Sequence, residues 1–196
     1  MKIINGLFIA VLAFMFIACS EVEPTRLTNI QGLLPNLEFK LTNEDNRTVT
    51  EKDYLGQTVV VFFGFTNCPD VCPSTLHELA EVLNKLGDLA EQVTVLFISV
   101  DPKRDSLPKL KRYTDVFGPA FIGLTAEGDL IKQMSKRYRV TFGYGAADNS
   151  GNYDVSHSGA VFIFDKHGRA RLLATQKSSV EDVFWDLRQL INERAT

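Results

Sequence analysis

Two uninterrupted runs of β-branched and aromatic residues constrain this chain most. They cover residues 58–63 and 93–100, and neither alternates with polar residues. Runs of this kind are typical of strands that are buried on both faces, as in the centre of a parallel sheet. Between them the sequence predicts a helix that begins near Ser74, with Pro73 in its first turn and Gly87 at its end. Strand, helix and strand in this order predict an α/β fold with parallel central strands and helices on the faces of the sheet.

The remaining pattern adds helices and one antiparallel hairpin. A short strand or hairpin is expected over residues 37–49, a long loop over 142–155, and helices over 107–116, 129–138 and 180–191. Residues 159–164 and 170–174 flank the turn 165–169 and predict a hairpin. This order is that of the thioredoxin-like α/β fold, a central mixed β-sheet flanked by helices, here with an insertion before the C-terminal hairpin.

Cys68 and Cys72 come directly after the first central strand, where open parallel sheets place their functional sites. A disulfide between them would close a very small loop and so remove little entropy from the unfolded chain, which disfavours a purely structural role. A redox role is favoured by the position of Cys72 near a helix N-terminus, where the thiolate is stabilised. Thioredoxin-type enzymes, however, have two residues between their cysteines and a cis-proline before the hairpin. This chain has three intervening residues, and no proline follows Pro119.

Metal binding is the third interpretation of the pair, and it needs a further ligand. Of the three histidines, His167 lies in the expected hairpin turn and His77 lies five positions after Cys72, so that it faces away on a helix. His157 directly precedes the hairpin and is the best candidate. Soft thiolates favour Cu(I), and imidazole suits copper in either oxidation state, whereas zinc would usually want a fourth ligand.

The chain resembles the Sco/SenC family of copper-binding thioredoxin-like proteins, which assist the assembly of the copper sites of cytochrome c oxidase. The resemblance is carried by residues 63–73, 99–105 and 155–158. It implies that Cys68, Cys72 and His157 are copper ligands. It also places Asp101 close to the copper as a supporting residue rather than a ligand. Ser156 stands where the family commonly has an acidic residue, which bears on copper release more than on ligation.

The implied function is that of a membrane-tethered copper chaperone for Cu(I), Cu(II) or both. Its expected partner is a copper-receiving subunit of cytochrome c oxidase or another copper chaperone. Oxidation to a Cys68–Cys72 disulfide would abolish binding, so the redox state of the pair gates loading. The alternative is a thiol–disulfide oxidoreductase that keeps a partner's cysteines reduced. A peroxidase, which thioredoxin-like folds also host, has little support from these residues.

The N-terminus predicts export and a membrane anchor. Lys2 and the apolar run 7–18 resemble a secretory signal, and Cys19 after Ala18 resembles a lipoprotein cleavage and lipidation site. An uncleaved anchor helix is the alternative. The expected division is a signal peptide at 1–18, a linker at 19–33 and one monomeric domain at 34–196, facing the periplasm or the cell exterior. The net charge of −3 and the lack of a basic stripe disfavour nucleic acid as a partner.

Overall fold

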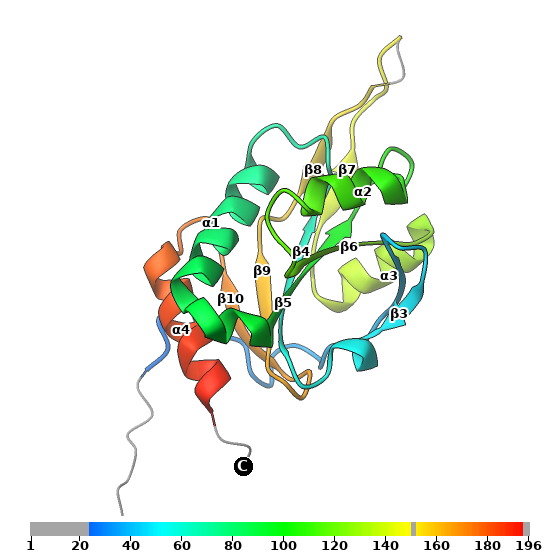
Figure 1. Ribbon diagram of the computed structural model, residues 1–196. Coiled ribbons are helices and arrows are strands. Elements are labelled where there is room, and N and C mark those ends of the chain that lie inside the picture. The colour runs from blue at the N-terminus through cyan, green and yellow to red at the C-terminus, as the bar shows by residue number, and fades with distance from the viewer. Residues whose placement is uncertain (1–23, 150–151, 194–196) are drawn as a thin grey trace, which may run out of the picture.

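An eight-stranded mixed sheet runs through the computed structural model, which describes residues 24–149 and 152–193 (Figure 1). Its strand order is β1-β10-β9-β4-β5-β6-β2-β3, and a separate two-stranded ribbon is formed by β7 and β8. The strands are β1 (Thr28–Asn29), β2 (Lys40–Asn43), β3 (Thr48–Thr50), β4 (Thr58–Gly64), β5 (Val93–Ser99), β6 (Phe121–Thr125), β7 (Phe142–Tyr144), β8 (Val155–His157), β9 (Val161–Phe164) and β10 (Ala170–Ala174). The helices are α1 (Val71–Leu86), α2 (Leu107–Thr114), α3 (Gly128–Arg137) and α4 (Val180–Asn192), with short 3₁₀ turns η1 (Glu51–Tyr54) and η2 (Gly87–Gln92).

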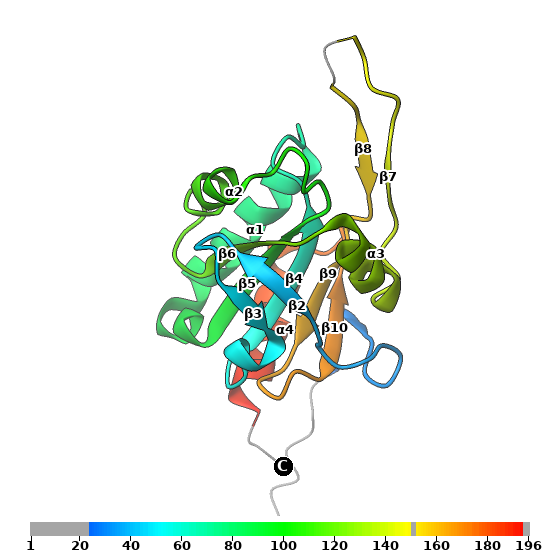
Figure 2. The same ribbon diagram turned by 90° about the vertical axis from the view of Figure 1, so that its right-hand side faces the viewer.

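The centre of the sheet is the parallel pair β4 and β5, as the two apolar runs predict. Every residue of both strands is buried, because helices cover both faces. Figure 2 shows α1 and α2 on one side of the sheet and α3 on the other. Strand β9 pairs antiparallel with the other edge of β4, so the sheet is mixed. The α/β class and the central mixed sheet are therefore confirmed.

Strand β6 is an element that the pattern did not predict. It continues the parallel part of the sheet beside β5. Gly123 interrupts its apolar run, and a Cβ at that position would lie 3.0 Å from the Cβ of Leu110 on α2. The glycine therefore permits close packing of α2 against the strand, a tertiary requirement that the local sequence does not display.

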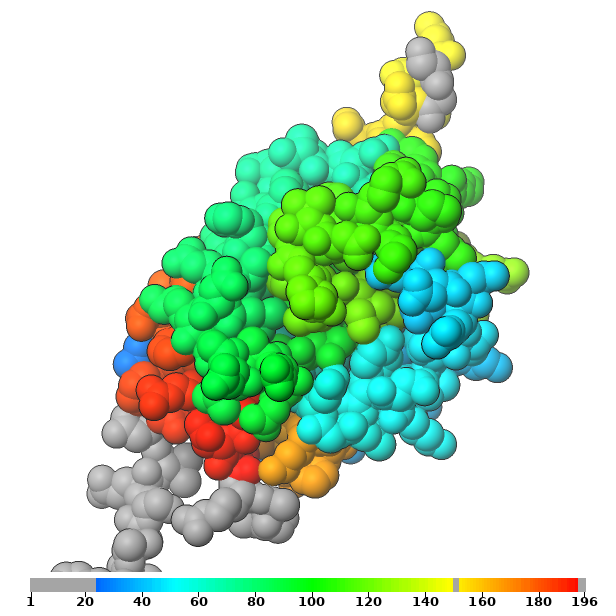
Figure 3. Space-filling view, viewed as in Figure 1, coloured from blue at the N-terminus to red at the C-terminus, as the bar shows by residue number. Residues whose placement is uncertain are grey.

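The insertion before the C-terminal hairpin differs from the expected long loop. Residues 142–144 and 155–157 pair antiparallel as β7 and β8, and together with residues 145–149 and 152–154 they form a narrow projection from the body (Figures 2 and 3). We call residues 142–149 and 152–157 the arm. Its strands are only three residues long, and β7 contains a glycine, so no period-two pattern marks them. The hairpin β9–β10 itself is confirmed.

The packed part of the chain reaches back beyond the boundary expected at residue 34. Strand β1 pairs with β10, and Leu27 and Ile30 are each only 5% exposed. The expected signal peptide and Cys19 lie outside the described residues. Within the part of the chain that the structure describes, none of the helices has the length and apolar character needed to span a bilayer.

The buried carboxylate of Asp186 on α4 fixes this N-terminal segment. It accepts hydrogen bonds from the backbone N–H groups of Arg26, at 2.9 Å, and Leu27, at 2.7 Å. Replacing Asp186 by Ala should leave both donors unpaired and lower the free energy of unfolding by about 1–3 kcal/mol. Alanine is the better helix former, so helix propensity opposes this loss rather than causing it.

Urea unfolding checks this prediction against Asp129→Ala, a control at an exposed aspartate that pairs with the surface Lys132. The control should lose less than about 1 kcal/mol. An Asp186→Ala protein that is no less stable than the control would contradict the assigned role.

Candidate metal centre

Cys68 lies in the loop that joins β4 to α1, and Cys72 is the second residue of α1. The helix begins at Val71, three residues before the expected start, so Cys72 sits in its first turn. Its backbone N–H points at the sulfur of Cys68, with an N–Sγ distance of 3.4 Å. Both cysteines are free thiols, Cys72 fully buried and Cys68 half-buried. One sulfur thus faces the interior and its neighbour remains within reach of solvent.

Gly64, the last residue of β4, makes room for the buried sulfur. A Cβ at this position would lie 2.8 Å from the Sγ of Cys72 and 2.6 Å from the ring of Phe97. Real Cβ atoms do not approach other atoms so closely, so any larger residue would displace the thiol or the ring. The glycine therefore belongs to the construction of the site.

Asp105 holds the loop that carries Cys68. Its carboxylate accepts hydrogen bonds from the N–H and hydroxyl of Thr66, at 3.0 and 2.5 Å, and from the hydroxyl of Ser99, at 2.7 Å. The side chain is almost fully buried, so these bonds tie the cysteine loop firmly to the end of β5. Asp105 was not among the site residues expected from the sequence. The available signal was the cluster of Thr66, Ser99 and Asp105 just beyond two adjacent parallel strands.

His157, the last residue of β8, brings its ring to the two sulfurs. Its Nε2 lies 3.2 Å from the Sγ of Cys72 and 4.0 Å from the Sγ of Cys68. Its Nδ1 lies 3.0 Å from the carbonyl oxygen of Ser158 and donates a hydrogen bond to it. That bond fixes the tautomer, so that the lone pair of Nε2 is directed at the cysteines.

Aromatic rings flank the imidazole of His157, and burial shifts the pKa values of both His157 and Cys72. Phe62 and Phe65 pack against His157 edge-on, with ring centroids 5.9 and 5.7 Å away. Burial lowers the pKa of His157, because desolvation disfavours the imidazolium. Burial likewise raises the pKa of the Cys72 thiol far above its usual range. Cys72 does lie in the first turn of α1, but its burial opposes the thiolate that a helix N-terminus favours.

The three side chains form one compact donor set. The sulfurs of Cys68 and Cys72 and a ring nitrogen of His157 all lie within 4.8 Å of one another. Among the described residues this is the only group of three or more His, Cys, Asp or Glu side chains close enough to share an ion. Two soft sulfurs and one neutral imidazole fit three-coordinate copper, whereas a structural zinc site would want a fourth ligand.

The other candidate residues lie away from this group. His77 is exposed on α1, and His167 is exposed in the turn between β9 and β10. Asp101 is buried at the end of β5. Its carboxylate binds Arg104 and Tyr153 rather than either cysteine. Its support of the site therefore stays a prediction.

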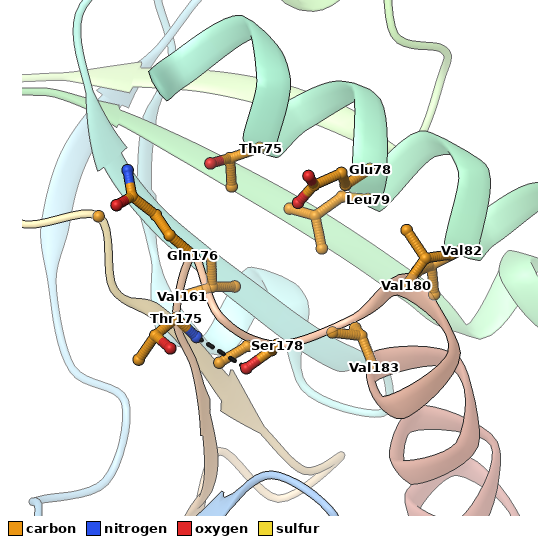
Figure 4. A pocket seen from close by; sticks show the side chains of 12 residues that line it. Thr75, Glu78, Leu79, Val82, Val161, Thr175, Gln176, Ser178, Val180 and Val183 are labelled. Carbon is orange, nitrogen blue, oxygen red and sulfur yellow. Dashed lines mark hydrogen bonds between the residues drawn. The ribbon is translucent and has the colours of Figure 1, made fainter. Parts of the chain in front are cut away.

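A small cavity lies outside the donor set. Figure 4 shows it between α1 and the segment joining β10 to α4, lined by Thr75, Leu79 and Gln176 among others. Its volume of about 20 Å³ suffices for a water molecule. None of the three donor residues lines it, so it forms no part of the proposed metal site.

The sequence is similar to one known family of proteins. The family profile described as SCO1/SenC matches residues 31–192. Protein SCO1 homolog, mitochondrial, from Homo sapiens is 34% identical over 150 residues, which are 76% of this chain and 50% of that protein. Protein SCO2 homolog, mitochondrial, from Bos taurus is 35% identical over 156 residues, 78% of this chain and 58% of that protein. The chain thus spans little more than half the length of these relatives.

Solved structures of similar proteins share the fold. Bradyrhizobium japonicum ScoI, solved with copper bound, matches with a TM-score of 0.72 and 34% identity, over 79% of this chain and 98% of ScoI. Yeast Sco1, also solved with copper bound, matches with a TM-score of 0.75 and 30% identity, over 83% of this chain and 91% of that one. These matches confirm the predicted thioredoxin-like fold.

The unequal burial of the two thiols predicts unequal reactivity. With limiting iodoacetamide near neutral pH, Cys68 should be alkylated at least about tenfold faster than Cys72, because Cys72 is buried and stays protonated. Peptide mapping by mass spectrometry measures both rates in the reduced, metal-free protein. In a Cys68→Ser control Cys72 should remain slow. Faster modification of Cys72 than of Cys68 would contradict the assignment.

Proposed function

This chain belongs to the SCO1/SenC family, and we propose that it is a copper chaperone that holds copper through Cys68, Cys72 and His157. The observation that carries the proposal is the donor set itself, with two sulfurs and a neutral imidazole nitrogen within 4.8 Å. Copper-bound structures of similar proteins support the choice of metal. The proposed destination is a copper site of cytochrome c oxidase, loaded directly or through another copper chaperone.

Loading exchanges the proton of Cys72 for copper. Copper needs the thiolate, and burial keeps Cys72 protonated at neutral pH, so its proton leaves as the metal–sulfur bond forms. The imidazole of His157 gives up no proton from Nε2, because its lowered pKa leaves that nitrogen free. Half-buried Cys68 provides the accessible ligand through which a partner's thiol or imidazole can begin ligand exchange.

The redox state of the pair controls whether the site can be filled. Joining the two sulfurs in a disulfide releases two electrons and two protons to an oxidant, such as a partner's disulfide, and removes both thiolate ligands. The oxidised protein would then retain only His157 as a ligand. Reduction by a dithiol partner restores both thiols and with them copper binding.

A thiol–disulfide oxidoreductase is the second candidate, and the accessible thiol of Cys68 favours it. The pair would reduce the cysteines of a partner's copper site and become a disulfide itself. His157→Ala separates the two functions, because a chaperone needs the imidazole as a ligand whereas thiol exchange does not.

Export is part of the proposal. A signal peptide at 1–18 and a lipid on Cys19 would tether the domain to a membrane, outside the cytoplasm, through a short linker. The named relatives are mitochondrial proteins, which is consistent with a client in a respiratory membrane. A single monomeric domain without nucleic-acid partners completes the assignment.

Copper affinity tests the ligand set directly. The reduced protein should bind one equivalent of Cu(I) in competition with a chromophoric chelator. His157→Ala should weaken binding at least about 100-fold, because losing a ligand costs more than losing the support of one. Cys68→Ser and Cys72→Ser should weaken it further, since a hydroxyl is a poor ligand for Cu(I).

His77→Ala and His167→Ala are the matched controls, since both histidines are exposed and outside the group. Each should bind copper like the unaltered protein. Loss of affinity in these controls equal to that of His157→Ala would refute the assigned ligand set. Retention of full thiol-exchange activity by a His157→Ala protein with unchanged copper affinity would favour the oxidoreductase.

A further inference from the structure

The arm carries His157 and is attached to the body at the end of β5 and in the turn that follows it. The hydroxyl of Tyr144 donates to the carbonyl oxygen of Val100, and the remaining contacts are made to Tyr153. Tyr153 lies in the arm two residues before β8 begins, and four positions before His157. Arg104, in the turn that follows β5, donates from Nη1 to the carbonyl oxygen of Tyr153 at 2.9 Å. Its guanidinium also stacks on the ring of Tyr153, 3.8 Å from the ring centroid.

Asp101 completes the attachment from the same turn. Its carboxylate accepts one hydrogen bond from the hydroxyl of Tyr153, at 2.6 Å, and another from the Nε of Arg104, at 2.5 Å. Asp101 is only 1% exposed, and its own backbone N–H donates to the hydroxyl of Ser99 on β5. Arg104 therefore binds the carbonyl oxygen and the ring face of Tyr153, and Asp101 binds its hydroxyl. Both residues lie in the turn that directly follows β5.

The same arginine faces the aromatic wall of the metal centre. Its guanidinium lies 6.0 Å from the ring centroid of Phe65, and Phe65 packs edge-on against His157. Arg104 thus lies between the segment that leads to His157 and one of the rings that flank its imidazole. It contacts no atom of the donor set.

We infer that Arg104, held by Asp101 and stacked on Tyr153, is a positioning residue that keeps the arm in the register and orientation needed for His157 to face the two cysteines. The inference deepens the proposed function, on which it rests, because it assigns the preorganisation of the third copper ligand to a body–arm contact. It also gives Asp101 its role: the carboxylate acts on the site through Arg104 and Tyr153.

The first test needs no metal. In hydrogen exchange on the reduced metal-free protein, Arg104→Gln should accelerate the amides that close the arm at least about tenfold. These are Gly145 N–H, bonded to the carbonyl of Asp154, and Ser158 N–H, bonded to that of Thr141. The amides of β4 and β5 should exchange as before. The matched control is Arg112→Gln, at an exposed arginine on α2, which should change neither group of amides.

The second test is a double-mutant cycle on Cu(I) affinity. Arg104→Gln should weaken binding about 10–100-fold in the unaltered background, as removal of a residue that orients a ligand does. In a His157→Ala background the same change should matter less than about threefold, because the ligand that Arg104 positions is gone. Arg104→Lys should restore little, since an ammonium cannot bind Asp101 and Tyr153 as a planar fork does.

Equal loss of copper affinity in both backgrounds would overturn the inference, because Arg104 would then act without His157. Unchanged exchange of the arm in Arg104→Gln would overturn it as well. If the amides of β4 and β5 also exchange faster, Arg104→Gln has disturbed the whole domain. The same two tests are then made on Tyr153→Phe, which removes only the hydroxyl that binds Asp101. If the unaltered protein binds no Cu(I), the proposed function fails, and the exchange of the arm alone decides the positioning role.

Discussion

The antiparallel pairing of β4 with β9 is the constraint on which the metal centre depends. β4 runs toward the cysteine loop, and β9 begins only four residues after His157, with Phe62 of β4 opposite Val161 of β9. Because β4 and β9 run in opposite directions, the last residues of β4 and the first residues of β9 lie at the same end of the sheet. Cys72 and His157, 85 positions apart in the chain, come within 3.2 Å for this reason.

Burial then sets the chemistry of the groups that this pairing brings together. The pKa of His157 is lowered and that of Cys72 is raised by the same physical cause, removal of the charged form from water. The metal-free site is thus a neutral imidazole beside a protonated, buried thiol, which is a poor nucleophile. A soft metal ion can offset the cost of ionising Cys72, and a solvent-borne disulfide cannot reach that sulfur easily. Burial of Cys72 thus leaves half-buried Cys68 as the sulfur of the pair that is open to exchange with an external disulfide or thiol.

The sequence predicted those features that local pattern determines. The continuous apolar runs identify β4 and β5, and their order with the intervening helix indicates that the cysteines follow the first central strand. The grouping of His157 with the cysteines follows from its place just before the hairpin. Pro73 does lie in the first turn of α1, at its third position, but the start at Val71 was missed because the helical spacing of apolar residues begins only after the proline. The burial of Cys72, which opposes the thiolate expected at a helix N-terminus, is a property of the packed core that the local sequence does not display.

Other parts of the site depend on contacts between distant residues and leave little local trace. The ribbon β7–β8 consists of two short strands separated by a segment rich in Gly and Asn, so its pairing is visible only in three dimensions. The buried bonds of Asp105 to the cysteine loop, and of Arg104 and Asp101 to the arm, join the turn after β5 to segments about 40 and 50 residues away. These bonds between the turn, the cysteine loop and the arm hold the donor atoms in place.

X-ray absorption of the reduced protein loaded with one equivalent of Cu(I) tests the central claim most directly, because it reports the atoms bonded to copper. We expect a three-coordinate spectrum with two sulfur scatterers and one imidazole nitrogen. The sulfur contribution should fall when Cys68 and Cys72 are changed to Ser, and the imidazole contribution should be lost in His157→Ala. Copper bound without sulfur scattering, or a spectrum that is the same in all three variants, would contradict it.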